Sequence, residues 1–359
     1  GIVVAPSLSA AAPPGFRTMA GGHPLPNEGS FEAAQAILEL LAKAGERDVV
    51  FFLLSGGGSA LVERPLDPQV TLADVRELNR CLVQCGASID EINAVRKHVS
   101  AIKGGRLAVA ASAAMKITLG ITDVPEGQES ALASGPTLPD PTTVRDACGV
   151  IARYGLLGKL PARIRARFEN PGTIPETPKA SHPAFSRSAF QILLGRDDLF
   201  HPAHRAAEAA NFAAVCDNST DNWPVSQAAD FLLEQLAALK RANPGRSAAV
   251  IADGEVSSPV TGDGVGGRNS AFVLDCVAKI AGRPIAVISV GTDGIDGSSS
   301  AAGAVADGET LARAHALGLD PDGSFRRSDS FTFFQKLGDA IVTGPTGNNL
   351  RDLRILLAE

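Results

Sequence analysis

Strand-forming segments that are apolar along their whole length alternate with longer helical patterns in this 359-residue chain. Such a strand is buried on both faces, and helices between such strands are typical of a parallel sheet. We therefore predict an α/β fold of two layered α/β domains with mainly parallel sheets. Strands are expected at 1–5, 48–54, 115–123, 188–194, 212–216, 247–252, 284–290 and 339–343. Helices are expected at 30–44, 71–84, 88–112, 143–155, 201–211, 225–242, 268–281, 307–317 and 348–357.

The segment 170–188, NPGTIPETPKASHPAFSRS, is rich in Pro, Ser and Thr and has no periodic pattern. Such a composition is typical of a linker between domains. We expect an N-terminal Rossmann-like domain over 1–185 and a C-terminal α/β domain over 186–359. The chain begins inside an expected strand at 1–5, without Met, so we expect an N-terminal segment to be missing.

The composition argues against several classes of binding partner. A formal net charge of −6 gives no bulk attraction to nucleic acid or to an anionic membrane. Apolar runs such as 48–54 are too short to cross a bilayer, and no signal-peptide pattern opens the chain. The five cysteines form no metal-ligand motif, so we expect reduced thiols in a cytoplasmic protein. The oligomeric state stays open, with a homodimer as one option.

A glycine-rich turn follows the apolar strand 48–54. Three adjacent glycines are more than a tight strand-to-helix turn needs, whereas a loop of this kind presents backbone N–H groups to an anion. A tight turn and an anion cradle are equally good interpretations of this loop alone. The candidate binding residues are Ser55, Gly56, Gly57, Gly58 and Ser59.

A basic face follows along 88–112. Ser88 and Glu91 have the spacing of a capping box, and polar residues then recur at helical spacing on one side of the helix. A solvated helix face is the alternative, but this one lacks the interspersed acids that such a face usually carries. We favour a helix that faces an anion, with Asn93, Arg96, Lys97 and Lys103 as candidate ligand-binding residues.

The loop 262–274, GDGVGGRNSAFVL, allows two interpretations. Its glycines fit the spacing G-x-G-x-x-G of a dinucleotide site, but the segment 255–261 intervenes after the preceding strand 247–252. Arg268 at the start of the next helix suits contact with a phosphate or an oxyanion better. We therefore name Gly264, Gly266 and Gly267 as candidate phosphate-binding residues.

Acidic residues follow two expected strands. Asp123 ends the strand 115–123, while Asp293 and Asp296 follow the strand 284–290 in the sequence GTDGIDG. Carboxylates at strand ends suit Mg²⁺ or a hydroxyl-bearing substrate, although each could instead cap a turn. The three are candidate metal ligands.

The turn TGPTGNN at 343–349 is a further candidate anion site, and its first four residues nearly repeat SGPT at 134–137. Its candidate residues are Thr343, Gly344 and Thr346. Together, the glycine turns, the basic helix and the strand-end acids indicate a site for a polyphosphate, a small acid and a metal. Phosphoryl transfer needs those elements, because it depends on positioning and charge neutralisation.

In this order of motifs the chain resembles the type II glycerate kinases, also named hydroxypyruvate reductases, which carry a C-terminal domain called the multi-organism fragment with rich leucine. The resemblance covers essentially the whole chain. It depends on nine motifs: GGHPLPNEGS, LLSGGGSALVERP, EINAVRKHVSAIKGGRLA, ITDVP, SGPTLPD, DGE, GDGVGGRNS, GTDGIDG and TGPTGNNL.

The resemblance implies ATP- and Mg²⁺-dependent phosphorylation of D-glycerate at its 2-hydroxyl, in a cleft between two α/β domains. It implies a catalytic Arg268 and a catalytic Asp293. The family also uses a Lys upstream of the first motif, which has no counterpart here, and this chain departs from the family at EGQES after Asp123.

As a mechanism, we expect Asp293 to orient the hydroxyl or accept its proton, with Asp296 supporting it or the metal. Arg268 would offset the charge on the transferred phosphoryl group. The alternatives are a nicotinamide-dependent hydroxypyruvate reductase and a non-catalytic sensor of a phosphorylated metabolite.

Overall fold

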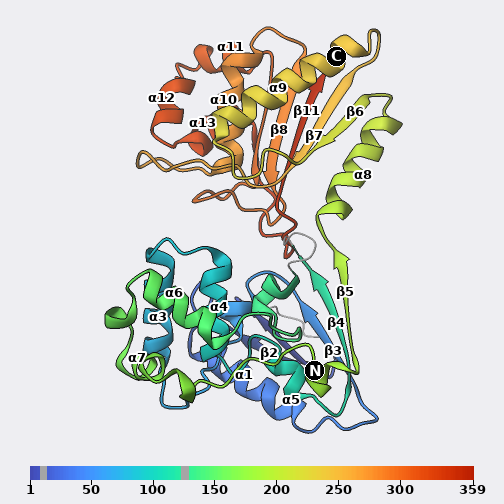
Figure 1. Cartoon of the computed structure of the whole chain (residues 1–359). Coiled ribbons are helices and arrows are strands. Elements are labelled where there is room, and N and C mark those ends of the chain that lie inside the picture. Colours follow the sequence, from blue (N-terminus) through green and yellow to red (C-terminus); the bar gives the residue numbers. More distant parts are fainter. Residues whose placement is uncertain (9–13, 123–128) are drawn as a thin grey trace. The chain divides into compact units, whose positions relative to one another are not determined.

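The computed structural model of the chain describes residues 1–8, 14–122 and 129–359 (Figure 1). The chain forms two compact units, Gly1–Leu193 and Leu194–Glu359. The expected domain boundary at 185/186 lies a few residues earlier, just before the strand Ser188–Leu194. Among the described residues, no helix combines the length and the apolar character needed to span a membrane.

The N-terminal unit contains a three-stranded sheet in the order β3-β4-β5 and a separate parallel pair, β1 and β2. β3 and β4 pair in parallel. The strands are β1 (Ile2–Ala5), β2 (Arg17–Ala20), β3 (Val49–Leu54), β4 (Met115–Ile121) and β5 (Ser188–Leu194). The α-helices are α1 (Glu28–Leu41), α2 (Gly58–Leu61), α3 (Leu72–Gln84), α4 (Ile89–Val99), α5 (Arg106–Ala110), α6 (Val144–Arg153) and α7 (Ala162–Glu169).

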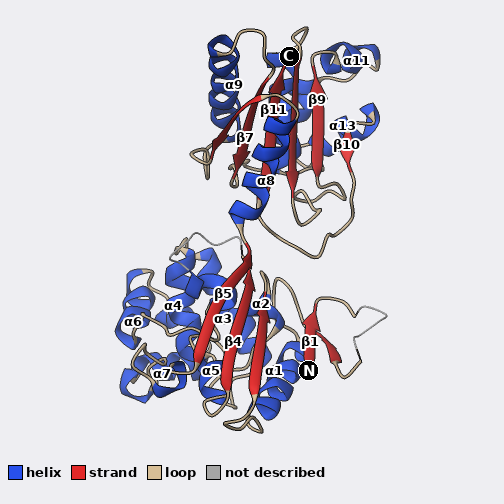
Figure 2. Cartoon of the chain, turned by 90° about the vertical axis from the view of Figure 1, so that its right-hand side faces the viewer, coloured by secondary structure: helices blue, strands red, loops and turns tan. Residues whose placement is uncertain are grey.

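Short 3₁₀ segments complete this unit, at η1 (Glu129–Ser134), η2 (Leu157–Lys159), η3 (Pro171–Thr173) and η4 (Pro183–Phe185). The described helices lie on one side of the sheet β3-β4-β5, and Figure 2 views the sheet from its other side. On β3, Val49, Phe51 and Leu53 are exposed, whereas Phe52 between them is buried. The strand is therefore apolar on both faces, as the sequence pattern indicated, but among the described residues only one face is covered.

The helix expected at 88–112 is two helices. α4 begins with the predicted capping box, in which Ser88 accepts a hydrogen bond from the amide of Glu91 and Glu91 accepts one from the amide of Ser88. It ends at Val99, because Ser100 adopts an extended conformation. α5 begins only after Gly105, whose φ of 83° lies in the left-handed region that favours glycine. The adjacent glycines Gly104 and Gly105, both with positive φ, therefore separate the two helices.

The C-terminal unit is a six-stranded sheet in the order β10-β9-β8-β11-β7-β6. Its strands are β6 (Ala213–Asp217), β7 (Ala248–Asp253), β8 (Ile285–Gly291), β9 (Gly303–Asp307), β10 (Ala340–Ile341) and β11 (Asp352–Ala358). Its helices are α8 (Arg196–Ala209), α9 (Val225–Ala242), α10 (Arg268–Ile280), α11 (Thr310–Ala316), α12 (Pro321–Arg326) and α13 (Ser330–Leu337). α9 and α10 pack against each other and against the sheet, over a core that includes Leu232, Phe272 and Val287.

This sheet is mixed. β6 and β7 are parallel, β11 lies antiparallel between β7 and β8, and β9 is antiparallel to both β8 and β10. The strands β6, β7, β8 and β10 thus share one direction, which is the α/β pattern that the sequence predicted, while β9 and β11 run the other way. The prediction of a helix at 348–357 was wrong, because residues 352–358 form β11 in the middle of the sheet.

Candidate active site

Three strand ends meet at one edge of the C-terminal sheet. Because β11 is antiparallel to both neighbours, its first residue lies level with the last residues of β7 and β8. Asp352 pairs with Gly291 of β8, and Leu353 pairs with Asp253 of β7. The DGE segment after β7, the GTDG loop after β8 and the start of β11 therefore share this edge. Ligands of α/β proteins gather at such strand ends.

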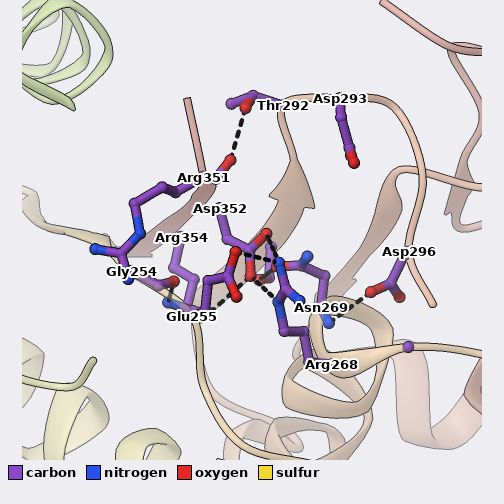
Figure 3. Close-up of polar contacts among 12 residues, drawn as sticks. Gly254, Glu255, Arg268, Asn269, Thr292, Asp293, Asp296, Arg351, Asp352 and Arg354 are labelled. Atoms are coloured by element: carbon purple, nitrogen blue, oxygen red, sulfur yellow. Dashed lines mark hydrogen bonds and ion pairs between the residues drawn. The ribbon is translucent and has the colours of Figure 1, made fainter. Parts of the chain in front are cut away.

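Arg268, the first residue of α10, reaches this edge (Figure 3). Its Nε and Nη2 donate to the two carboxylate oxygens of Asp352 at 2.5 and 3.1 Å. Its Nη2 also lies 2.9 Å from Oε1 of Glu255. Burial alone would lower the pKa of Arg268, but the bonds to Asp352 and the charges of Asp352 and Glu255 raise it instead. The guanidinium is thus a fixed cation, held from two sides by carboxylates.

A second arginine, Arg354, lies next to the carboxylate of Asp352. Arg354 is fully buried, and its Nη1 donates to the carbonyl of Gly254 at 2.8 Å, while its Nη2 lies 3.4 Å from Asp352. Its guanidinium also stands 5.3 Å from the centre of the Phe272 ring. Burial lowers its pKa from the ordinary arginine value. Asp352, which is 1% exposed, therefore neutralises two arginines at once.

A third arginine, Arg351, holds the DGE loop in place through Asp221. Nη2 of Arg351 lies 2.5 Å from Oδ1 of Asp221, and the same oxygen accepts a hydrogen bond from the amide of Glu255 at 2.9 Å. Burial would raise the pKa of Asp221, but the bonds from Arg351 and from the Glu255 amide lower it. The loop that carries Glu255 is therefore fastened to β11 through Asp221.

Asp293 lies two residues beyond β8, at the same edge as Arg268 (Figure 3). Its Oδ1 accepts a hydrogen bond from the amide of Ile295 at 3.0 Å, and no residue in the described part of the chain donates to its second oxygen. The carboxylate is partly exposed. Asp293 thus combines a fixed orientation with one oxygen that can serve a ligand.

The predicted TGPT turn packs against this loop. The amide of Thr346 donates to the carbonyl of Asp293 at 3.0 Å, and its hydroxyl donates to the carbonyl of Thr292 at 2.6 Å. The hydroxyl of Thr343 donates to the carbonyl of Gly344 at 2.9 Å. Thr343 and Thr346 are exposed, so the turn lies beside Asp293 with its surface open.

Asp296, predicted as a metal ligand, has a different structural role. It is 1% exposed, and its carboxylate accepts bonds from the amides of Asn269 and Ser270 at 2.9 and 2.8 Å and from the Ser270 hydroxyl at 2.5 Å. It therefore caps the first turn of α10, directly behind Arg268. Its pKa is raised by burial. Both oxygens are in use, so the geometry supports a positioning role rather than metal binding.

The glycines of the loop 262–267 are explained by packing inside the unit. A Cβ on Gly264 would lie 2.5 Å from Asp329, one on Gly266 would lie 2.2 Å from the Ser330 hydroxyl, and one on Gly267 would lie 2.3 Å from Asp296. The backbone amides of this loop also have internal acceptors, such as the carbonyl of Arg327 for Gly264. The dinucleotide interpretation and the direct phosphate contacts predicted for these glycines both lose support.

The SGGGS loop lies in the N-terminal unit, between β3 and α2. Gly57 has a φ of 81°, and a Cβ there would lie 3.0 Å from the exposed His23 ring. The amides of Gly56, Gly57, Gly58 and Ser59 donate to no residue in the described part of the chain. Ser55 is exposed, and its hydroxyl makes only a long contact of 3.5 Å to the carbonyl of Gly56. The loop keeps the free backbone donors that an anion site requires.

Hydrogen bonds join this loop to two other motifs. The hydroxyl of Ser59 lies 2.9 Å from that of Ser134, which donates to Oδ1 of the buried Asn93 at 3.0 Å. Ser134 and Ala133 both have positive φ values, of 61° and 50°. Backbone strain of this kind persists where surrounding contacts enforce it and is common at functional sites. Three separate sequence motifs thus meet around Ser134.

The basic residues predicted on α4 and beyond are largely neutralised inside the unit. Lys97 lies 3.2 Å from Asp140, and the fully buried Lys103 forms an ion pair with Glu63. Arg96 is half-buried, and its Nε donates to Oδ1 of Asn79 at 2.7 Å. Ligand contacts predicted for Lys97 and Lys103 therefore have no support in this geometry, whereas Arg96 keeps nitrogens for a ligand.

A preformed cation cage is absent from the described residues, where no group of three or more His, Cys, Asp or Glu side chains is placed to hold a metal. Asp123 lies outside the described residues. Mg²⁺ in phosphoryl-transfer sites is often bound by one or two carboxylates together with substrate phosphates and water. Asp293, with one uncommitted oxygen at the strand end, fits that mode of binding.

Sequence reasoning missed Glu255, Asp352 and Arg354 as site residues. Glu255 stood within the DGE motif without an assigned role. Asp352 and Arg354 lay in the segment expected to be helical. A signal existed, because the alternation D-L-R-I places two opposite charges at i and i+2, which is one face of a strand.

The chain is similar to several known proteins. Residues 1–169 match a domain of unknown function (DUF4147), and residues 248–352 match the MOFRL family. A D-glycerate 2-kinase of Thermotoga maritima is 35% identical over 343 residues, which is 95% of this chain and 79% of that protein. A "Putative hydroxypyruvate reductase" of Agrobacterium vitis is 38% identical over 340 residues, covering 93% of this chain and 76% of that protein.

Among solved structures, a glycerate kinase of Thermotoga maritima has a TM-score of 0.90 and 34% sequence identity. The similarity covers all of this chain and 85% of that chain. Both units, with the strand-end cluster around Arg268, therefore lie within the region of similarity. The chain belongs to the type II glycerate kinase family, whose members are named glycerate 2-kinase or putative hydroxypyruvate reductase.

Proposed function

We propose that this chain catalyses the ATP-dependent phosphorylation of D-glycerate at its 2-hydroxyl, giving 2-phosphoglycerate. The observation that carries the proposal is Arg268, anchored by two bonds to the buried Asp352 at the strand edge where Asp293 also lies. Relatives that share almost the whole chain are named glycerate 2-kinase and glycerate kinase, which supports the same reaction.

Arg268 supplies fixed positive charge. Its Nε and Nη2 are committed to Asp352 and Glu255, and its Nη1 has no acceptor in the described part of the chain. A guanidinium that is already immobilised need not be reoriented when negative charge develops on the transferred phosphoryl group. Nη1 is the nitrogen that we assign to that contact.

Asp293 acts on the acceptor. Its uncommitted carboxylate oxygen accepts the hydrogen bond of the 2-hydroxyl of glycerate, which orients the hydroxyl oxygen for attack and gives its proton a destination. The same carboxylate is the described group that would hold Mg²⁺ together with the phosphates of ATP. When bound, the ion neutralises phosphate charge.

In the N-terminal unit, the amides of the loop residues 56–59, which donate to no described residue, are candidate donors to an anion, and the nitrogens of Arg96 that do not bond to Asn79 are further candidates. The glycerate carboxylate and the nucleotide phosphates are the anions of the proposed reaction, and both suit backbone donors. The buried Ser134 and Asn93 hold the loop from behind, through Ser59.

The test measures ADP release with ATP, Mg²⁺ and D-glycerate, and determines the position of the new phosphate ester by ³¹P NMR. Arg268→Ala is expected to lower kcat by about 10²–10³-fold, as the loss of a preorganised donor does elsewhere. Arg241→Ala is the matched control, because Arg241 is 67% exposed and pairs only with an exposed Glu234. Equal activity in the two variants, or oxidation of NADH by hydroxypyruvate without ADP release, would refute the proposal.

A further inference from the structure

The C-terminal unit contains an open cavity of about 570 Å³ beside the start of α10. Its walls come from the start of α9, from the segment 257–261, from the end of α12 and from the first turn of α10. A cavity of this size lies in the range typical of small-molecule sites. Of the residues that line the cavity, Gly266 and Gly267 belong to the candidate phosphate-binding loop, and the others have no role in the proposed reaction.

The walls are mainly apolar. Val225 and Ala271 form buried wall, Phe325 is partly buried, and Pro259 and Val260 form the outer rim. Val260 is 81% exposed. A small polyhydroxy acid such as glycerate has no apolar surface to bury here, whereas a flat heteroaromatic ring has two apolar faces.

One rim of the cavity also offers backbone hydrogen-bonding groups. The segment 257–261 is held at both ends, by the bond from the amide of Ser257 to the carbonyl of Trp223 at 2.7 Å and by the bond from the amide of Thr261 to the Ser328 hydroxyl at 3.0 Å. Between these points, the backbone groups of Ser258 and Val260 bond to no residue in the described part of the chain. Backbone donors and acceptors that are held in place in this way can bond to the polar edge of a nucleobase.

The cavity reaches the start of α10. Gly266 and Gly267 line it, and Arg268 follows them directly as the first residue of α10. A ligand with an apolar ring in the cavity and an anionic tail that extends past Gly267 would bring the tail to the N-terminus of α10, of which Arg268 is the first residue.

We propose that this cavity binds the purine base of the nucleotide, with the segment 257–261 contacting the edge of the base and Phe325 with Val225 covering its faces. The inference depends on the proposed function for its choice of a nucleotide. It goes further by placing the base in the C-terminal unit, and it assigns the apolar walls to nucleotide affinity rather than to glycerate.

The experiment compares two serine-to-phenylalanine variants of the full chain. Ser258 and Ser247 are both half-exposed, and neither side chain makes a hydrogen bond to a described residue. Ser258 lines the cavity beyond the C-terminal end of β7, whereas Ser247 precedes the other end of the same strand. Isothermal titration calorimetry with ADP, adenosine and pyrophosphate separates binding of the base from binding of the phosphates.

We expect Ser258→Phe to weaken ADP and adenosine at least tenfold and to leave pyrophosphate unchanged, while Ser247→Phe changes none of them. Unchanged ADP affinity in Ser258→Phe, or equal weakening of ADP and pyrophosphate, would overturn the proposal. These measurements need no turnover, so they separate failure of this site from failure of the kinase assignment.

A second measurement on the unmodified chain does not depend on the folding of a variant. Photolysis with 8-azidoadenosine triphosphate, followed by peptide mapping, should label the segment 257–261 or the end of α12 near Phe325. Labelling confined to other peptides would refute the proposed base site.

Discussion

Asp352 is the residue whose removal tests the architecture of the site most directly. Its carboxylate is 1% exposed, it holds Arg268 by two bonds, and it is 3.4 Å from the fully buried Arg354. Asp352→Asn keeps the size of the side chain but removes its charge. Two arginines would then share a buried site without their common carboxylate.

Breaking a buried ion pair by removing one partner typically costs about 3–5 kcal/mol. We expect the lower end, about 3 kcal/mol, because Arg268 is 38% exposed and water screens part of its charge. At roughly 2–4 °C per kcal/mol for a unit of this size, the melting temperature of the C-terminal unit should fall by about 6–12 °C. Loss of the anchor of Arg268 should also lower kcat by about 10²-fold.

The chain supplies its own site-specific probes for this measurement. Its single tryptophan, Trp223, lies in the C-terminal unit, and its single tyrosine, Tyr154, lies in the N-terminal unit. Denaturation followed by tryptophan fluorescence therefore reports on the unit that contains Asp352. Asp230→Asn is the matched control, because Asp230 is 69% exposed and pairs with Lys279 at the surface, so it should change stability by less than about 1 kcal/mol.

A double variant separates stability from activity. Adding Arg354→Met to Asp352→Asn removes one of the two uncompensated charges from the buried site, so part of the lost stability should return. Activity should stay low, since Arg268 still lacks its anchor. The reasoning fails if Asp352→Asn is no less stable than Asp230→Asn, or if kcat recovers in the double variant.

Three further outcomes are expected. Gly57→Ala should reduce stability, because Gly57 has a φ of 81° and the new Cβ would meet His23 at 3.0 Å. Gly56→Ala adds a Cβ with no atom other than those of its chain neighbours within 4 Å and should leave stability nearly unchanged, so equal losses of melting temperature in the two variants would contradict this reasoning. Asp296→Ala should destabilise the C-terminal unit by roughly 1–2 kcal/mol through loss of the α10 cap and should not change the Mg²⁺ dependence of the rate; a shifted Mg²⁺ optimum would restore the metal-ligand interpretation. The pKa of Asp221 is lowered in the folded chain, so ionised Asp221 stabilises the fold at pH values above its unfolded pKa. This stabilisation is lost as the pH falls through the lower, folded pKa. The difference in stability between wild type and Asp221→Asn, followed by Trp223 fluorescence, should therefore be constant above about pH 5 and shrink below about pH 4.

The order of motifs in the sequence was sufficient to predict Arg268 and Asp293 as catalytic residues. An arginine at a helix start and an acid directly after an apolar strand are local signals, and the structure places both Arg268 and Asp293 at the same edge of the C-terminal sheet. The capping box of α4 and the break at Gly104 and Gly105 are local signals too, since both depend on neighbouring residues only.

Partners distant in the chain were decided by tertiary structure alone. Lys97 and Lys103 have the spacing of a ligand-binding face, yet their carboxylate partners lie 43 and 40 residues away. Asp296 has the sequence context of a metal ligand, and only the packing of its loop against α10 reveals a helix cap. No periodic pattern encodes contacts at such distances.

The type and the position of β11 were also decided by the tertiary structure. Its apolar residues predict a regular element, but a short apolar run suits a helix and a strand equally well. Insertion between β7 and β8 satisfies the backbone hydrogen bonds of all three strands and brings Asp352 level with Gly291. The sequence by itself determined the α/β class and predicted Arg268 and Asp293 as the catalytic pair. Only the tertiary structure, through the register of one central strand, decided which carboxylate holds the arginine in place.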